Sequence, residues 1–263
     1  MQSHRRLSAT LAGGILLALA PLASGCATTS PRVSEEDARK ATSHLDIGAD
    51  HLKNGRPALA LREFLAAEQL DPRNAHVQYA LGEAYLAQNK RQDSELHYRR
   101  SIELAPDFQD AKLSLSVLMI LEERYPEAGA LCQQLVDDPT FPGPWRALAN
   151  LGFAELKEGR LVDARKHLKL AREYQKEYWP ATLSLSQLEV QEGHRLEAIA
   201  LLREVLALQP GPAVEAEANY RIAEIYISLG QREQAVAHLN TAVAQTPDGQ
   251  WGRRSQEYLK LIR

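Results

Sequence analysis

The sequence is poor in the residues that build several common classes of protein. Two cysteines, Cys26 and Cys132, occur in 263 residues, which excludes a disulfide-rich scaffold and a zinc finger built from cysteines. Aromatic residues make up only 6% of the chain. Positive charge is not in excess either, because 31 basic residues are set against 34 acidic ones and the formal net charge is −3. This balance does not indicate a nucleic-acid-binding surface.

Signatures of catalysis are also missing. The sequence has no Walker-type phosphate loop and no GxGxxG, GxSxG or HExxH motif. The acidic run 35–37 and the pair Glu122-Glu123 do not resemble a catalytic carboxylate dyad. Cys132 is better interpreted as a small buried apolar residue than as a nucleophile. We therefore predict that the protein is not an enzyme, that it needs no cofactor or metal, and that it has no small-molecule substrate.

No run of eighteen or more apolar residues occurs, so the sequence predicts no internal transmembrane helix. The first residues instead have the order of an export signal, with Arg5 and Arg6 followed by an apolar stretch over 9–23. This stretch ends in Leu-Ala-Ser-Gly before Cys26, which resembles the lipobox of bacterial lipoproteins. In that class the cysteine thiol receives a diacylglycerol, and the new amino terminus is acylated, for example with palmitate. The alternative is an ordinary secretory signal with an incidental cysteine.

These features predict the organisation of the N-terminal part. Residues 1–25 are a lipoprotein signal peptide, and residues 26–40 are a lipidated N-terminus with a flexible polar tether. Lipid chains on Cys26 would anchor a soluble domain firmly, because each buried methylene contributes about 0.8 kcal/mol. Position 27 is alanine rather than the aspartate that resembles an inner-membrane retention signal. We therefore expect a lipid-anchored protein of the outer membrane that faces the periplasm.

The rest of the chain consists of one sequence unit that occurs six times. A small residue recurs 34 to 37 residues apart, a turn residue lies five positions before it, and a bulky residue lies four positions after it. The small residues are Ala60, Ser94, Ala128, Ala164, Ala198 and Ala235. The turn residues are Gly55, Asn89, Glu123, Gly159, Gly193 and Gly230. The bulky residues are Phe64, Tyr98, Cys132, Leu168, Leu202 and Leu239.

This pattern resembles the tetratricopeptide repeat, a pair of antiparallel helices about 34 residues long. The small residue lets the two helices approach closely, and the turn residue supplies a left-handed cap. The predicted fold is therefore an all-α solenoid of six helix-turn-helix repeats over 41–249, with a capping helix over 250–263. The predicted repeats are 41–74, 75–108, 109–144, 145–178, 179–215 and 216–249. Three prolines in 139–144 predict a rigid bend at the end of the third repeat.

In tetratricopeptide repeats the first helices line a concave surface, through positions two, five, nine and twelve of each helix. Positions five and twelve are apolar or aromatic in all six repeats. Two interpretations remain: these side chains pack within the repeat core, or they form an apolar groove for a partner segment. The predicted groove residues are Leu45, Leu52, Tyr79, Leu86, Leu113, Val117, Ile120, Phe153 and Leu156.

Five histidines raise the question of metal binding. His44 and His51 lie seven residues apart on one predicted helix, but no carboxylate or cysteine completes a plausible ligand set. His97, His167 and His238 recur at one position in alternate repeats, which are too far apart to share an ion. We interpret the first pair as core residues and the other three as residues on a solvated helix face.

The lipobox, the tether and the six repeats together resemble the outer-membrane lipoproteins of type IV pilus biogenesis, the PilF/PilW/Tgl group. The resemblance is sharpest at Thr140-Phe141-Pro142, which is followed by Asn150-Leu151-Gly152. It implies a pilotin: a non-enzymatic protein that binds the pilus secretin, PilQ, and promotes its outer-membrane localisation and multimerisation, so that pili assemble and motility follows. The only residue to which this resemblance assigns a role is Cys26, the lipid anchor. The alternative is a lipoprotein adaptor for cell-wall hydrolases or for β-barrel assembly proteins.

Overall fold

The computed structural model describes residues 33–262, and within them all regular structure is helical. Thirteen helices occur in this part of the chain, as six hairpins followed by one single helix. The helices are α1 Glu35–Lys53, α2 Pro57–Leu70, α3 Ala75–Ala87, α4 Arg91–Leu104, α5 Gln109–Leu121, α6 Tyr125–Val136, α7 Pro144–Lys157, α8 Leu161–Tyr174, α9 Trp179–Gln191, α10 Arg195–Ala207, α11 Pro212–Ser228, α12 Arg232–Gln245 and α13 Gln250–Leu261. None of these helices combines the length and apolarity needed to cross a bilayer.

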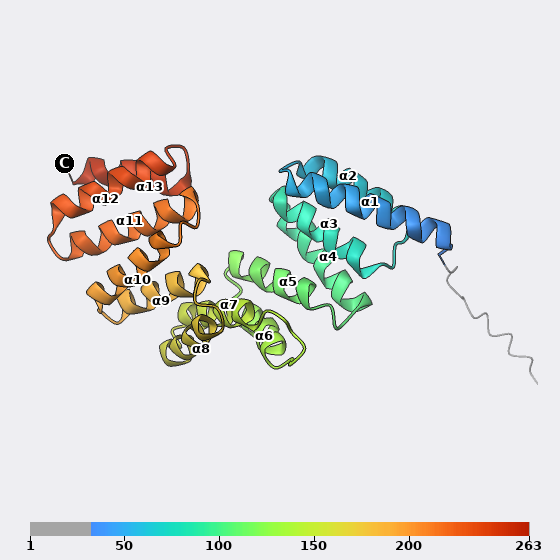
Figure 1. Cartoon of the computed structure of the whole chain (residues 1–263), viewed down its shortest axis with the longest axis horizontal. Coiled ribbons are helices and arrows are strands. Elements are labelled where there is room, and N and C mark those ends of the chain that lie inside the picture. Colours follow the sequence, from blue (N-terminus) through green and yellow to red (C-terminus); the bar gives the residue numbers. More distant parts are fainter. Residues whose placement is uncertain (1–32, 263) are drawn as a thin grey trace, which may run out of the picture.

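The hairpins stack side by side along an open arc, from α1 and α2 at one end to α11, α12 and α13 at the other (Figure 1). Each first helix packs against its own second helix, and each second helix packs against the first helix of the next hairpin. In the middle of the molecule α5 and α7 lie toward the inside of the arc, and α6 and α8 lie outside them (Figure 1). The predicted all-α solenoid is confirmed.

The turn residues have the backbone conformation that the repeat pattern predicts. Four of the six turns contain glycine, and the other two contain Asn89 and Glu123, both at φ 59°. The four glycines have φ values from 67° to 85°. In this left-handed region a residue ends a helix and lets the chain reverse. Each of the six turns therefore lets the second helix of its hairpin pack against the first.

The six small residues lie at the contact between the two helices of each hairpin and are fully buried. The bulky residue four positions later, such as Phe64 or Tyr98, is also buried and packs against the first helix of the same hairpin. Each hairpin thus has the same interlocked core, and the hairpins are joined by further apolar clusters across their faces.

Four predicted boundaries coincide with helix starts, α7 begins one residue before the predicted 145, and two others differ by more. Ala75, Gln109, Trp179 and Gln250 begin helices where the repeat pattern predicts. The first helix, however, begins at Glu35, so the expectation of a flexible tether to residue 40 is wrong for 35–40. The Ser34 side chain caps α1 by accepting a hydrogen bond from the Asp37 amide, and three acidic residues fill the first turn.

The second difference lies in α11, which begins at Pro212 rather than at 216. Proline is well tolerated at the first helical position because its missing amide would be unpaired there. Gly211, at φ 109°, precedes it and turns the chain into the helix.

The earlier residues of the chain, including the predicted signal peptide 1–25, the anchor Cys26 and the start of the tether, lie outside the described residues.

The proline-rich bend at 139–144 fixes the junction between α6 and α7. Phe141 is buried there in a cluster with Leu113 and Cys132. The Gln109 amide donates hydrogen bonds to Asp138 at 2.6 Å and to Thr140 at 3.0 Å, which ties the bend to α5. The bend therefore places an aromatic side chain in the core where the two halves of the solenoid meet.

Candidate functional site

The inner surface of the arc contains three adjoining hollows, which we call together the inner groove. The first, of about 200 Å³, lies between α3, α5 and α7. The second, of about 310 Å³, lies between α5, α7, α9 and α11 and shares Val117 and Asn150 with the first. The third, of about 450 Å³, lies between α9 and α11 and shares Lys157, Gln187 and Arg221 with the second. The shared residues make the three hollows one continuous surface.

The helix face that lines the inner groove is wider than the predicted one. Besides the predicted positions two, five, nine and twelve, the lining comes from positions six and thirteen of the first helices. Position six contributes Ser114, Asn150, Ser184 and Arg221, and position thirteen contributes Leu121, Lys157, Gln191 and Ser228. At 100° per residue, positions six and thirteen lie beside position two on the helix circumference and widen the face by about 40° to one side. Because most of these added residues are polar, the groove is less apolar than expected.

The predicted groove residues consequently divide into three sets. Leu86, Val117, Ile120 and Phe153 line the hollows as predicted. Leu113 also lines the first hollow, although it is only 4% exposed. Leu156 is 1% exposed and lines none of the three hollows, so its assignment to a partner-binding surface is corrected: it is a core residue. Leu45, Leu52 and Tyr79 are half-buried against the clusters of the first two hairpins and line none of the three hollows. The core interpretation therefore holds for four of the nine residues.

Three apolar side chains on the inner surface remain open to solvent. Val117 is 37% exposed, Leu121 is 47% exposed and Val190 is 45% exposed. Phe153 lies among them in the second hollow, with the Lys157 ammonium 5.1 Å from its ring centroid. Leu121, like Lys157, was missed in the sequence because position thirteen was not counted as a groove position. The apolar part of the groove is thus confined to the middle of the molecule, over α5, α7 and α9.

Charged groups surround this apolar part. Arg221 pairs with Glu217 at 2.6 Å and lies 5.3 Å from the ring of Trp251. At the other end, Glu83 accepts a hydrogen bond of 2.5 Å from the Tyr98 hydroxyl, whose pKa is raised by burial. The groove therefore combines an apolar centre with polar ends, a composition that suits a protein segment better than a small apolar ligand.

The recurrent histidines do not lie on a solvated face, so that expectation is wrong. His97 and His238 are half-buried, and their Nδ1 atoms lie 2.8 Å and 2.7 Å from the side-chain oxygens of Gln78 and Asn219. Burial lowers the pKa of both imidazoles, which favours the neutral form. His167 instead contacts Glu155 at 2.7 Å. These histidines link the two helices of their own hairpins.

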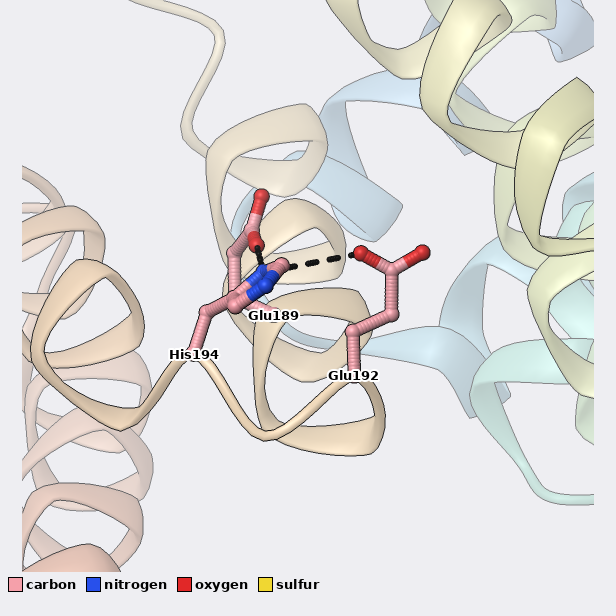
Figure 2. A group of neighbouring side chains, drawn as sticks. All are labelled: Glu189, Glu192 and His194. Atoms are coloured by element: carbon pink, nitrogen blue, oxygen red, sulfur yellow. Dashed lines mark hydrogen bonds and ion pairs between the residues drawn. The ribbon is translucent and has the colours of Figure 1, made fainter.

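One cluster of possible metal ligands occurs in the described residues, formed by Glu189, Glu192 and His194 at the turn between α9 and α10 (Figure 2). His194 Nδ1 lies 2.8 Å from a carboxylate oxygen of Glu189 and 3.6 Å from one of Glu192. The guanidinium of Arg165, from α8, contacts both carboxylates. It also lowers the pKa of Glu189. Because Arg165 already supplies the positive charge, we assign the cluster as a link between helices.

Cys132 lies in the core of the third hairpin and is fully buried. Burial raises the pKa of its thiol to about 12. Since the thiolate is the reactive form of cysteine, this environment makes Cys132 a poor nucleophile. Its packing role agrees with its place in the bulky position of the repeat.

Two family models, both described as tetratricopeptide repeat, match the sequence. One matches residues 45–107 and again 79–142, and the other matches residues 189–253. The chain is a tetratricopeptide-repeat protein. Such repeats form scaffolds that bind proteins, which fits the composition of the inner groove. No curated protein sequence is significantly similar to the chain.

Several solved tetratricopeptide-repeat structures are similar to this one. PilW, a widely conserved type IV pilus biogenesis factor, superposes with a TM-score of 0.71 at 19% identity, over 81% of this chain and 97% of that one. Pseudomonas aeruginosa PilF superposes with a TM-score of 0.67 at 15% identity, over 85% of this chain and all of that one. A tetratricopeptide repeat protein from Parabacteroides merdae gives 0.68 at 16% identity, over 84% of both chains. At these identities the likeness shows a shared fold.

Proposed function

We propose that this tetratricopeptide-repeat protein is a lipid-anchored adaptor of type IV pilus assembly. In this proposal it binds the pilus secretin and promotes its localisation and multimerisation in the outer membrane. The observation that carries the proposal is the similarity to PilW, which extends over 97% of that pilus biogenesis factor. The similarity to PilF over its full length is a second support.

The proposed anchor is Cys26, at the end of the lipobox-like sequence. A diacylglycerol and a further acyl chain there would hold the repeats at the periplasmic surface of the outer membrane. The protein would then meet secretin subunits where they insert. This part of the proposal predicts that a Cys26→Ala protein is still made but no longer fractionates with the outer membrane. A variant that remains in the outer membrane fraction would exclude lipidation as the anchor.

The proposed binding surface is the inner groove. Its exposed apolar centre over α5, α7 and α9 would be covered by a segment of the secretin subunit before the ring closes. Without a partner, these side chains would remain in contact with water. Catalysis is not needed for this role.

The experiment that tests the proposal compares secretin in the outer membrane of a wild-type strain and a strain that lacks this protein. We expect secretin oligomers to be lost, and pili with them, and to return when the wild-type chain is supplied. Undiminished oligomers in the deletion strain would contradict the proposal. Affinity capture from detergent-solubilised envelopes then decides the partner: secretin supports the proposal, whereas cell-wall hydrolases or β-barrel assembly subunits alone would refute it.

A further inference from the structure

Two cations in the third hollow of the inner groove have no carboxylate partner among the described residues. Lys157 ends α7, with its ammonium over the ring of Phe153. Arg195 begins α10 and donates a hydrogen bond of 3.0 Å to the Ser228 hydroxyl. By contrast, Arg221 in the same hollow is paired with Glu217. The chain as a whole is acidic, with a net charge of −3, so this local excess of positive charge stands out.

The charges that line the third hollow favour an anionic occupant. Lys157, Arg195 and Arg221 contribute three positive charges, and Glu224 contributes one negative charge. Even with Arg221 neutralised by Glu217, two unpaired cations are set against one carboxylate. Carboxylate groups of a bound segment would form charge-assisted hydrogen bonds with Lys157 and Arg195. A basic segment would meet repulsion at the same place.

Apolar side chains adjoin these cations. Val190 lines the third hollow beside Arg195, and Leu121 lines the second hollow beside Lys157. Both are nearly half exposed. A segment that lies in the groove would therefore cover apolar surface over α5 and α9 and reach the cations at the end of α7 and the start of α10.

The groove is long enough for a chain to pass through it. Its hollows adjoin from α3 to α11, which spans five first helices. With about 8–10 Å between packed helices, the distance is roughly 35 Å. An extended chain covers this distance with about ten residues at 3.3 Å per residue. A continuous groove of this length suits an internal segment, whereas a chain terminus needs a pocket that closes around it.

From these observations we propose that the inner groove binds an internal partner segment of about ten residues, which has apolar side chains in its middle and acidic side chains at the end that lies on Lys157 and Arg195. This inference rests on the proposed function of the groove as a protein-binding surface. It specifies the chemistry of the segment and does not depend on the partner being the secretin.

Selection from a random peptide library tests the proposal in vitro. The probe is a phage library of random peptides of about ten residues, displayed between linkers so that no peptide terminus is free. The selecting protein is the full mature chain. The selection is repeated with a variant that carries Lys157→Glu and Arg195→Glu. It is also repeated with a matched control that carries Lys166→Glu and Lys169→Glu, at two exposed lysines on α8. Circular dichroism is used to check that all three proteins are equally helical.

We expect the wild-type and control proteins to enrich peptides that combine Leu, Val, Ile or Phe with Asp or Glu. The Lys157→Glu, Arg195→Glu variant should bind these peptides at least about tenfold more weakly, since loss of one charge-assisted contact amounts to about 1.4 kcal/mol or more. It should enrich peptides with Lys or Arg instead. Loss of acidic enrichment in the control as well would assign the effect to overall charge and overturn the proposal.

Three other results would also overturn it: no enriched peptides, enriched peptides without acidic residues, and acidic enrichment only in a parallel library with free C-termini. The last result would assign the cations to a terminal carboxylate. None of these results bears on whether secretin oligomers depend on this protein, so failure of this inference and failure of the proposed function are distinguishable.

Discussion

Gly82 of α3 lies against the ring of Tyr98 of α4, so closely that a Cβ atom on Gly82 would stand 2.5 Å from two ring carbons. A small residue of the first helix and a bulkier residue of the second are sixteen residues apart in every hairpin. A Cβ atom on Gly48 or Gly152 would likewise lie less than 3 Å from its partner. The pairs are Gly48 with Phe64, Gly82 with Tyr98, Ser116 with Cys132, Gly152 with Leu168, Ser186 with Leu202 and Ala223 with Leu239. The largest partners, Phe64 and Tyr98, are opposite glycine. The volume of one helix is thus matched to the space left by the other.

This match predicts the effect of adding one methyl group. Gly82→Ala should destabilise the protein by about 1–3 kcal/mol, because the ring of Tyr98 is buried and has no room to move. Gly129→Ala is the matched control: its Cβ would lie 3.7 Å from Leu151, an ordinary contact. It should leave stability unchanged or raise it by up to about 1 kcal/mol through helix propensity. Urea unfolding followed by circular dichroism measures both, and equal effects would contradict the prediction.

The turn residue Glu123 has a φ of 59°, in the left-handed region that a residue other than glycine adopts only with strain. Relief of the left-handed strain, about 1–2 kcal/mol, should exceed the entropic cost of glycine, about 0.5–1 kcal/mol. Glu123→Gly is therefore expected to stabilise the chain by about 0.5–1 kcal/mol. Gly159→Ala, at φ 79° with no atom near its Cβ, should destabilise it by a similar amount. Thermal unfolding of the two variants should move in opposite directions; a shift in the same direction would refute the argument.

Acidification should weaken the fold before the carboxylates titrate. Burial lowers the pKa of His97 and His238 below the ordinary value of 6.5. The unfolded chain then binds protons that the folded chain does not, so stability is fully present above pH 6.5 and falls as the pH drops toward the lowered values. Melting temperatures between pH 7.5 and pH 5 should show this decline. The variant His97→Gln, His238→Gln should flatten it, whereas His76→Gln, at an exposed position, should not.

The inner groove predicts where polar substitutions abolish partner binding. Leu121→Asp with Val190→Asp should prevent secretin capture and leave the helical content unchanged, because both side chains are already nearly half exposed. The control pair is Val162→Asp with Leu196→Asp, which are 84% and 71% exposed on the second helices α8 and α10. Capture by the control should equal that of the wild type. If both pairs capture secretin equally, the groove is not the binding surface.

The repeat pattern was sufficient to predict the hairpins because their determinants are local. A left-handed turn such as Gly55, a small residue such as Ala60 and a bulky one such as Phe64 each act within one hairpin, and each is visible in the sequence. The start of α1 could also have been read from Ser34 and the acidic residues after it. Because the polar composition of these residues resembled a tether, a helix was not predicted there.

The groove face was harder to predict because it depends on how far each first helix turns about its own axis when neighbouring hairpins pack. The first hollow illustrates this: Leu113 at position five and Ser114 at position six both line it, although only position five was predicted to face the groove. Position nine was correct, since Val117 and Phe153 both line the groove. The contacts of His97 and His238 were missed for a related reason, because their partners Gln78 and Asn219 lie nineteen residues away on the facing helix.

The closing helix α13 has a consequence for self-association. It packs against α11 and α12, and most of the residues that point away from them, such as Arg253 and Glu257, are polar or charged and exposed. A filament of solenoids joined end to end requires an open apolar face at both ends of every subunit. Because α13 closes one end, polymerisation by end-to-end stacking stops there, and many copies can be present at high concentration without forming fibres.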